Sequence, residues 1–281
     1  MADGRRVLVP VGDAQIEVVE QGRGEPVLLI QTALLAEEFR PMCREPALAD
    51  YRLIRMHRRG YEGSSPVTDI RSIAAEAADC EALLDALDVE RAHVVGLSFS
   101  STIAMQLAVD APRRVHSLSL LEAPPVHVSS ADEFRAANDE LAADRAEHGA
   151  VATLDRFWSR LLGPDWRDQV ERAVPGAVAQ MTRDATTFFD SDCPAVLSWP
   201  FGRERAAHVT RPVLYIGGSA SGQWFAEVRE LVRDWFGQAE VRTIQGADHS
   251  LALTHAAEVA AVLAEFLARH PVDRALEDAG N

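Results

Sequence analysis

Short apolar segments alternate with longer amphipathic ones along most of the chain. The short segments are rich in branched apolar residues and each is followed by a loop, which is typical of strands buried on both faces of a parallel sheet. The first two segments alternate polar and apolar residues around Gly12 and Asp13, as the arms of a hairpin do. The pattern predicts strands at residues 5–11, 15–21, 26–32, 51–57, 92–98, 115–122, 213–218 and 239–245.

Helical patterns lie between these strands. Apolar residues recur three and four positions apart in residues 70–87 and again in residues 255–270, which is the spacing of a helix with one buried face. Another helix is expected directly after Ser98. Because strands and helices alternate regularly, right-handed crossovers are expected. The sequence therefore predicts an α/β fold with a doubly wound, mostly parallel sheet.

Residues 125–208 interrupt this alternation with helical segments that contain three of the five tryptophans. Ligands of open α/β folds bind at the carboxyl edge of the sheet. We therefore expect a core formed by residues 1–124 and 209–281, with residues 125–208 as a helical cap over that edge. Helices that serve stability alone are the alternative.

The chain is acidic and of ordinary globular composition. Its 281 residues include 28 basic and 43 acidic side chains, for a formal net charge of −15, and 47% are hydrophobic. Nucleic acids and anionic membranes require a basic surface, so neither is an expected partner. The absence of a signal-like segment and of CxxC spacing favours a cytoplasmic protein with reduced cysteines. A homodimer is left open.

A short motif carries the most specific chemical signal. Gly96-Leu97-Ser98-Phe99-Ser100 ends a predicted strand and begins a predicted helix. It matches the G-x-S-x-G nucleophile elbow, except that Ser100 replaces the second glycine. Ser98 could instead be a simple helix cap. A serine nucleophile needs a base, and His249 follows the last strand within Gly246-Ala247-Asp248-His249.

With these motifs, and with a loop MHRRGYEGSS at residues 56–65, the chain resembles the α/β-hydrolase fold superfamily. The resemblance is to the serine-nucleophile type with an inserted cap. It implies a triad of Ser98, His249 and an acid that holds the imidazole in one tautomer. It implies no cofactor, and the scattered histidines of the chain match no metal-binding motif.

The acid departs from the family pattern. Family members usually carry it just after the strand at 213–218, where this chain has Ala220 and no carboxylate before Glu227. A known family alternative places the acid at the end of the preceding strand, which here is Glu122. Asp192 of the predicted cap and a dyad without an acid stay open.

The predicted oxyanion hole also departs from the family pattern. The resemblance implies that the backbone N–H groups of Phe99 and Ala33 stabilise the oxyanion. The family places His-Gly in the loop before the second donor, whereas this chain has Gln31 and Thr32. The missing glycine narrows the conformations that are open to the loop.

These residues predict a serine hydrolase that acts on an ester, a lactone, a thioester or a carbon–carbon bond next to a ketone. Dehalogenation and epoxide opening are excluded, because those family members need an aspartate where Ser98 stands. A mostly apolar small-molecule substrate is expected, and the departures motivate an alternative, a non-hydrolytic enzyme or small-molecule receptor. Aromatic residues that could wall the pocket or form the core of the cap are Phe157, Trp158, Phe188, Phe189 and Trp199.

Overall fold

One sheet of eight strands organises the molecule. In a computed structural model, which describes residues 4–272, the strand order is β1-β2-β4-β3-β5-β6-β7-β8. β1 pairs antiparallel with β2, and β2 antiparallel with β4, while every later pair is parallel. This confirms the predicted fold class. The strands are β1 Arg5–Val11, β2 Ala14–Gln21, β3 Pro26–Ile30, β4 Arg52–Met56, β5 Ala92–Leu97, β6 Val115–Leu121, β7 Val213–Gly218 and β8 Glu240–Ile244.

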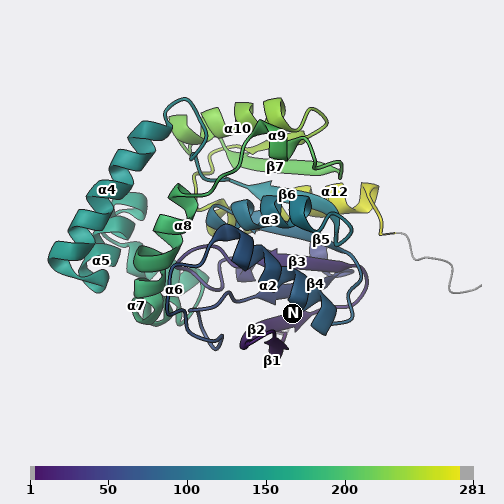
Figure 1. Cartoon of the computed structure of the whole chain (residues 1–281), viewed down its shortest axis with the longest axis horizontal. Helices are drawn as coiled ribbons and strands as arrows, with labels where there is room; N and C mark the ends of the chain where they lie inside the picture. The colour runs from purple at the N-terminus through teal and green to yellow at the C-terminus, as the bar shows by residue number, and fades with distance from the viewer. Residues whose placement is uncertain (1–3, 273–281) are drawn as a thin grey trace, which may run out of the picture.

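Helices cover both faces of the sheet (Figure 1). Residues alternate between the faces along each strand. Leu28 and Ile30 of β3 therefore join an apolar cluster with α2 and α3, whereas Val27 and Leu29 join another with α1 and α12. The core helices are α1 Arg40–Cys43, η1 Pro46–Leu48, α2 Ile73–Ala86, α3 Phe99–Asp110, α10 Gln223–Trp235, α11 Leu251–Thr254 and α12 Ala256–Arg269.

A helical insertion joins β6 to β7, within the segment predicted as a cap. Helices α4 to α8 stand at one side of the sheet, at the left of Figure 1. Residues of α5, α6, α7 and the segment 188–192 share an apolar cluster that also contains Leu34 and Leu35 from the loop after β3, so the insertion packs on that loop, whereas α8 packs on the core. Its helices are α4 Ala131–His148, α5 Ala150–Leu162, α6 Trp166–Ala173, α7 Ala177–Thr187, the π-helix η2 Phe188–Asp192, α8 Cys193–Leu197 and α9 Arg203–Ala206.

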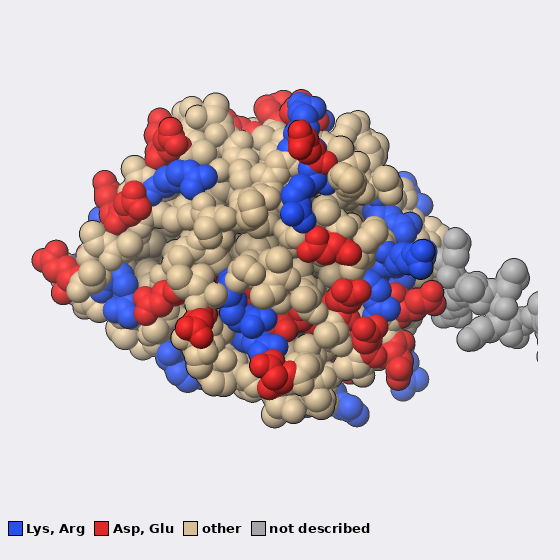
Figure 2. Space-filling model, in the orientation of Figure 1, with Lys and Arg blue, Asp and Glu red and all other residues tan. Residues whose placement is uncertain are grey.

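Charged side chains are spread over the surface rather than sorted by sign. Figure 2 shows acidic and basic residues interspersed on one face of the molecule. Between residues 4 and 272, no helix is both long and apolar enough to span a bilayer.

Candidate active site

Ser98 lies at the turn between β5 and α3 in a backbone conformation that non-glycine residues rarely adopt. Its φ is 48° and its ψ is −119°, and such strain typically persists at functional sites. Its N–H donates to the carbonyl of Leu121, 2.8 Å away, which ties the turn to β6. A Cβ on Gly96 would lie 2.5 Å from the carbonyl oxygen of Ser100. The close packing of helix on strand therefore requires glycine at position 96.

Ser100 has a structural use at the position where the elbow usually has glycine. Its buried Oγ accepts the N–H of Leu97 at 2.9 Å and donates to the carbonyl of Leu97 at 3.1 Å. The hydroxyl thus satisfies both polar backbone groups of the residue that precedes the nucleophile. Serine at position 100 thus makes hydrogen bonds that the usual glycine of the elbow could not make.

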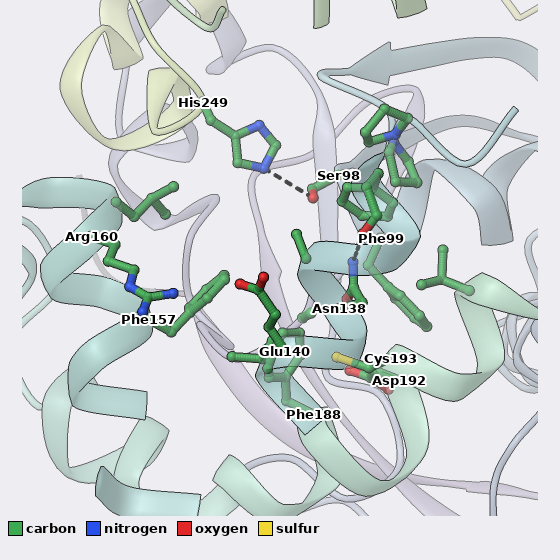
Figure 3. Close-up of a pocket in the computed structure, with 18 of the residues that line it drawn as sticks. Ser98, Phe99, Asn138, Glu140, Phe157, Arg160, Phe188, Asp192, Cys193 and His249 are labelled. Atoms are coloured by element: carbon green, nitrogen blue, oxygen red, sulfur yellow. Dashed lines mark hydrogen bonds between the residues drawn. The ribbon is translucent and has the colours of Figure 1, made fainter. Parts of the chain in front are cut away.

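His249 approaches the serine from the loop between β8 and α11. Its Nε2 lies 3.1 Å from Ser98 Oγ, the contact drawn as a dashed line in Figure 3. The ring of Phe225 stacks on the imidazole with centroids 4.4 Å apart and an interplanar angle of 26°. Phe225 therefore restricts the orientation of the imidazole, a contact that the sequence did not predict.

Glu122 lies behind the imidazole, directly after β6. Its Oε2 is 3.4 Å from His249 Nδ1, and the residue is fully buried. The other carboxylate oxygen, Oε1, accepts the N–H of Gly218 at 2.6 Å. The backbone at Glu122 has a φ of 46°, a second strained conformation. The structure thus aligns Ser98, His249 and Glu122 in one chain of contacts.

Neither alternative acid position contacts the imidazole, although Asp192 lines the same cavity as Ser98. Asp192 accepts hydrogen bonds from Arg58 and Tyr61 and makes none with the imidazole. Ala220 is exposed, and its N–H donates to the carbonyl of Ala247 at 2.8 Å. Of the three acid arrangements left open by the sequence, the geometry favours Glu122.

The two predicted oxyanion donors belong to neighbouring loops. Ala33 and Phe99 both line the same cavity as Ser98. Phe99 is the first residue of α3, and the first N–H groups of a helix have no acceptor within it. Gln31 fixes the Ala33 loop, since its Oε1 accepts the N–H of Arg58 at 2.8 Å. The role of the glutamine side chain is therefore structural.

A cavity of about 610 Å³ opens in front of Ser98, between the sheet edge and the insertion. Phe157 and Phe188 line it, as Figure 3 shows. The other aromatic candidates do not line this cavity. Trp158 and Phe189 belong to the apolar cluster of the insertion, and Trp199 donates its N–H to Gln106 at 2.9 Å. Aromatic lining residues that the sequence did not predict are Phe134, Trp224 and Phe225.

No metal site accompanies this arrangement in the described part of the chain. Residues 4–272 contain no group of three or more His, Cys, Asp or Glu side chains that could hold a metal ion.

Comparison with known proteins finds similar hydrolases. The chain is similar to two proteins named as carbamate hydrolase RutD. The one from Variovorax paradoxus is 28% identical over 79% of this chain and 83% of its own length. The one from Azorhizobium caulinodans is 36% identical over 39% of this chain, and the match spans less than half of that relative, 42%.

A solved structure shows the same fold. The enol-lactonase from Burkholderia xenovorans superposes with a TM-score of 0.78 at 19% identity, over 93% of this chain and all of its own. The family model of the alpha/beta hydrolase fold matches residues 26–256. The chain therefore belongs to the α/β-hydrolase fold family, as a hydrolase enzyme.

Proposed function

We propose that the protein is a serine hydrolase that cleaves an acyl bond of a mostly apolar small molecule. One observation carries the proposal. A strained serine lies 3.1 Å from a histidine whose other ring nitrogen faces a buried carboxylate, and the serine opens into an apolar cavity. Nucleophile, base and orienting acid in this geometry are the requirements for acyl transfer by serine.

In the first half of the reaction, Ser98 Oγ attacks the substrate carbonyl and His249 Nε2 takes the hydroxyl proton. Glu122 keeps the remaining ring proton on Nδ1 and stabilises the imidazolium that forms. The N–H groups of Phe99 and Ala33 stabilise the oxyanion. The imidazolium then gives its proton to the leaving group, and the acyl group stays on Ser98.

In the second half, water replaces the leaving group in front of the acylated serine. His249 removes a proton from this water, which attacks the acyl carbonyl, and the same proton returns to Ser98 Oγ as the acid departs. Each half of the reaction thus begins and ends with neutral imidazole. The cycle consumes one water and needs no cofactor.

The lining of the cavity supports the substrate class. Phenylalanine and tryptophan side chains line the approach to Ser98, together with charged side chains such as Glu140 and Arg160 (Figure 3); aromatic walls bind apolar groups, while a few polar groups fix orientation. The relatives are named for carbamate and enol-lactone substrates. We propose esters, lactones, thioesters and carbon–carbon bonds next to a ketone as the substrate range.

Labelling with a fluorophosphonate probe tests the nucleophile. The probe should modify Ser98, fail to react with Ser98→Ala and react far more slowly with His249→Ala. Ser101→Ala is a matched control, because it removes a nearby buried hydroxyl of α3 that bonds only the carbonyl of Leu121. Labelling that persists in Ser98→Ala contradicts the proposal.

The non-hydrolytic alternative predicts a different result. A screen of p-nitrophenyl esters should show turnover that depends on Ser98. Tight binding of small molecules without any turnover would instead favour a receptor or a cyclase-type enzyme. No contact in the described residues favours that alternative.

A further inference from the structure

A buried arginine supports the loop that carries one oxyanion donor. Arg58 follows β4 and is fully buried. Its Nε donates to the carbonyl of Gln31 at 3.0 Å, and its Nη2 donates to the carbonyl of Thr32 at 3.3 Å. Because these are the two residues before Ala33, the guanidinium fixes the peptide planes that lead to the Ala33 N–H.

The same guanidinium contacts the residue that carries the other donor. The Arg58 guanidinium carbon lies 4.4 Å from the centre of the Phe99 ring, within the range of a cation–π interaction. One side chain therefore contacts both segments that carry the proposed oxyanion donors, Ala33 and Phe99. A shift of Arg58 would move both donors.

The counter-charge of Arg58 comes from the insertion. Asp192 of the π-helix η2 pairs with Arg58 through two bonds, Nη1 to Oδ1 at 3.0 Å and Nη2 to Oδ2 at 2.6 Å. The two side chains are only 0% and 2% exposed. Glu76 lies 3.4 Å from Nη1, but burial raises its pKa to about 7, so it is only partly ionised at neutral pH.

Tyr61 adds a second link between Asp192 and the same loop. Its hydroxyl donates to Asp192 Oδ2 at 2.6 Å and accepts the N–H of Leu34 at 3.3 Å. Leu34 follows Ala33 and has a φ of 62°. The carboxylate of Asp192 is thus connected to the loop on both sides of Ala33.

We propose that Asp192 and Arg58 are positioning residues that make the oxyanion hole depend on the seating of the insertion. The inference rests on the proposed function. When the insertion packs on the core, Asp192 holds Arg58 in place and the loop is ordered. When it moves away, Arg58 loses its two bonds to Asp192 and keeps only the single 3.4 Å carboxylate contact with Glu76, so the guanidinium no longer has a bidentate partner that fixes its orientation. Turnover is then lost without any change at Ser98, His249 or Glu122.

The test neutralises Asp192, the counter-charge of Arg58, and compares the effect with that of neutralising the acid of a neighbouring arginine–aspartate pair. Asp192→Asn keeps the shape but removes the charge. The matched control is Asp79→Asn, because Asp79 binds the next arginine, Arg59, through two bonds of 2.8 Å and makes no bond to the residue 31–36 loop. Asp192→Asn should lower kcat by about 10- to 100-fold with KM within twofold. This decrease in kcat is smaller than the decrease of about 10²–10³ that follows the removal of a whole oxyanion donor.

An oxyanion mimic separates positioning from simple loss of folded protein. The Ki of an aryl trifluoromethyl ketone, whose adduct with serine carries an oxyanion, should rise by the same factor as kcat falls. A smaller fraction of folded enzyme would lower kcat and leave Ki unchanged. Tyr61→Phe, which removes one hydroxyl and no charge, should show the same parallel change at about 3- to 10-fold. Asp79→Asn should leave both quantities within twofold.

Hydrogen exchange provides a readout that needs no substrate. Peptides that cover residues 31–36 should exchange faster in Asp192→Asn, and at the wild-type rate in Asp79→Asn. Unchanged exchange and unchanged Ki in Asp192→Asn would overturn the inference. The hydrolase proposal would still stand if the fluorophosphonate probe labels Ser98 of the wild-type protein. A wild-type protein that neither reacts with fluorophosphonates nor turns over esters would overturn the hydrolase proposal, and the exchange result would still decide whether Asp192 orders the loop.

Discussion

The ends of β6 and β7 are neighbours at one edge of the sheet, yet they carry different chemistry. β6 is followed by Glu122, which is buried and reaches the imidazole of His249. β7 ends in Gly217 and Gly218 and is followed by exposed Ser219 and Ala220. The fold determines that both strand ends face the histidine loop. It does not determine which of them supplies the carboxylate.

The two strand ends are also adapted to each other. Gly218 donates its N–H to Glu122, and a Cβ on Gly218 would lie 2.2 Å from the carbonyl oxygen of Ala247. A Cβ on Gly217 would lie 3.0 Å from Glu122 Oε1. Gly217 thus leaves space for the carboxylate of Glu122, and Gly218 leaves space for the loop that carries His249. An acid at the end of β6 depends on small residues at the end of β7.

The largest effect is expected from neutralising the acid. Glu122→Gln should lower kcat by about 10⁴-fold, because the imidazole loses the group that sets its tautomer and stabilises its charge. Steady-state kinetics on a p-nitrophenyl ester measures the loss, and circular dichroism confirms that the fold is kept. Asp192→Asn should lower kcat far less, by about 10- to 100-fold. Near-normal turnover in Glu122→Gln would show that the enzyme needs no acid.

Filling the space at the end of β7 should cost stability. Gly218→Ala forces a methyl group against the carbonyl of Ala247, and such overpacking typically costs about 1–3 kcal/mol. Chemical denaturation should show this decrease in the free energy of unfolding. Gly237→Ala is the control, since a Cβ there would meet no atom within 4 Å. Equal stability in both variants would mean that the close contact with Ala247 does not require glycine at position 218.

Moving the acid to the other strand should restore part of the activity. Ala220 is joined by its N–H to Ala247, two residues before His249. An aspartate at position 220 therefore starts close to the histidine loop. The double variant Glu122→Gln, Ala220→Asp should be about tenfold faster than Glu122→Gln alone, a decrease of roughly 1.4 kcal/mol in the activation free energy. Ala220→Asn in the same background should give no gain.

The smallest effect is expected at the elbow. Ser100→Gly restores the residue that the elbow motif usually has but removes the two hydrogen bonds to Leu97. The free energy of unfolding should fall by at least about 1 kcal/mol, since each of the two lost hydrogen bonds contributes about 0.5–1.5 kcal/mol net. Thermal denaturation measures this change. A more stable Ser100→Gly would mean that the hydroxyl strains the turn instead of supporting it.

The sequence predicted the strands and the catalytic candidates because these depend on local signals. Alternation and apolar runs located all eight strands within two residues at each end. Glu122 could be inferred because parallel strand ends share an edge. The helix α10 was not predicted, and its Phe225 stacks on the catalytic candidate His249. Its apolar residues Val228, Leu231, Val232 and Trp235 recur at helical spacing, a local signal that could have predicted this helix.

Long-range contacts could not be predicted in the same way. Arg58 and Asp192 are 134 positions apart, and nothing in the residues around either one indicates a partner. Asp192 was a candidate acid because it is a carboxylate near the expected site. Its true surroundings depend on how the insertion packs on the core, and this depends on side-chain shape at many positions.

Strained backbone at the site has a consequence for protein engineering. Of five non-glycine residues with positive φ in the described chain, two are catalytic candidates: Ser98 and Glu122. Relieving such strain is a common route to a more heat-resistant protein, and the usual cost is lost activity. A selection for thermal tolerance alone would therefore favour glycine at these positions. The selected variants would have higher thermal stability and an impaired active site. Any such selection should therefore also screen for catalytic turnover.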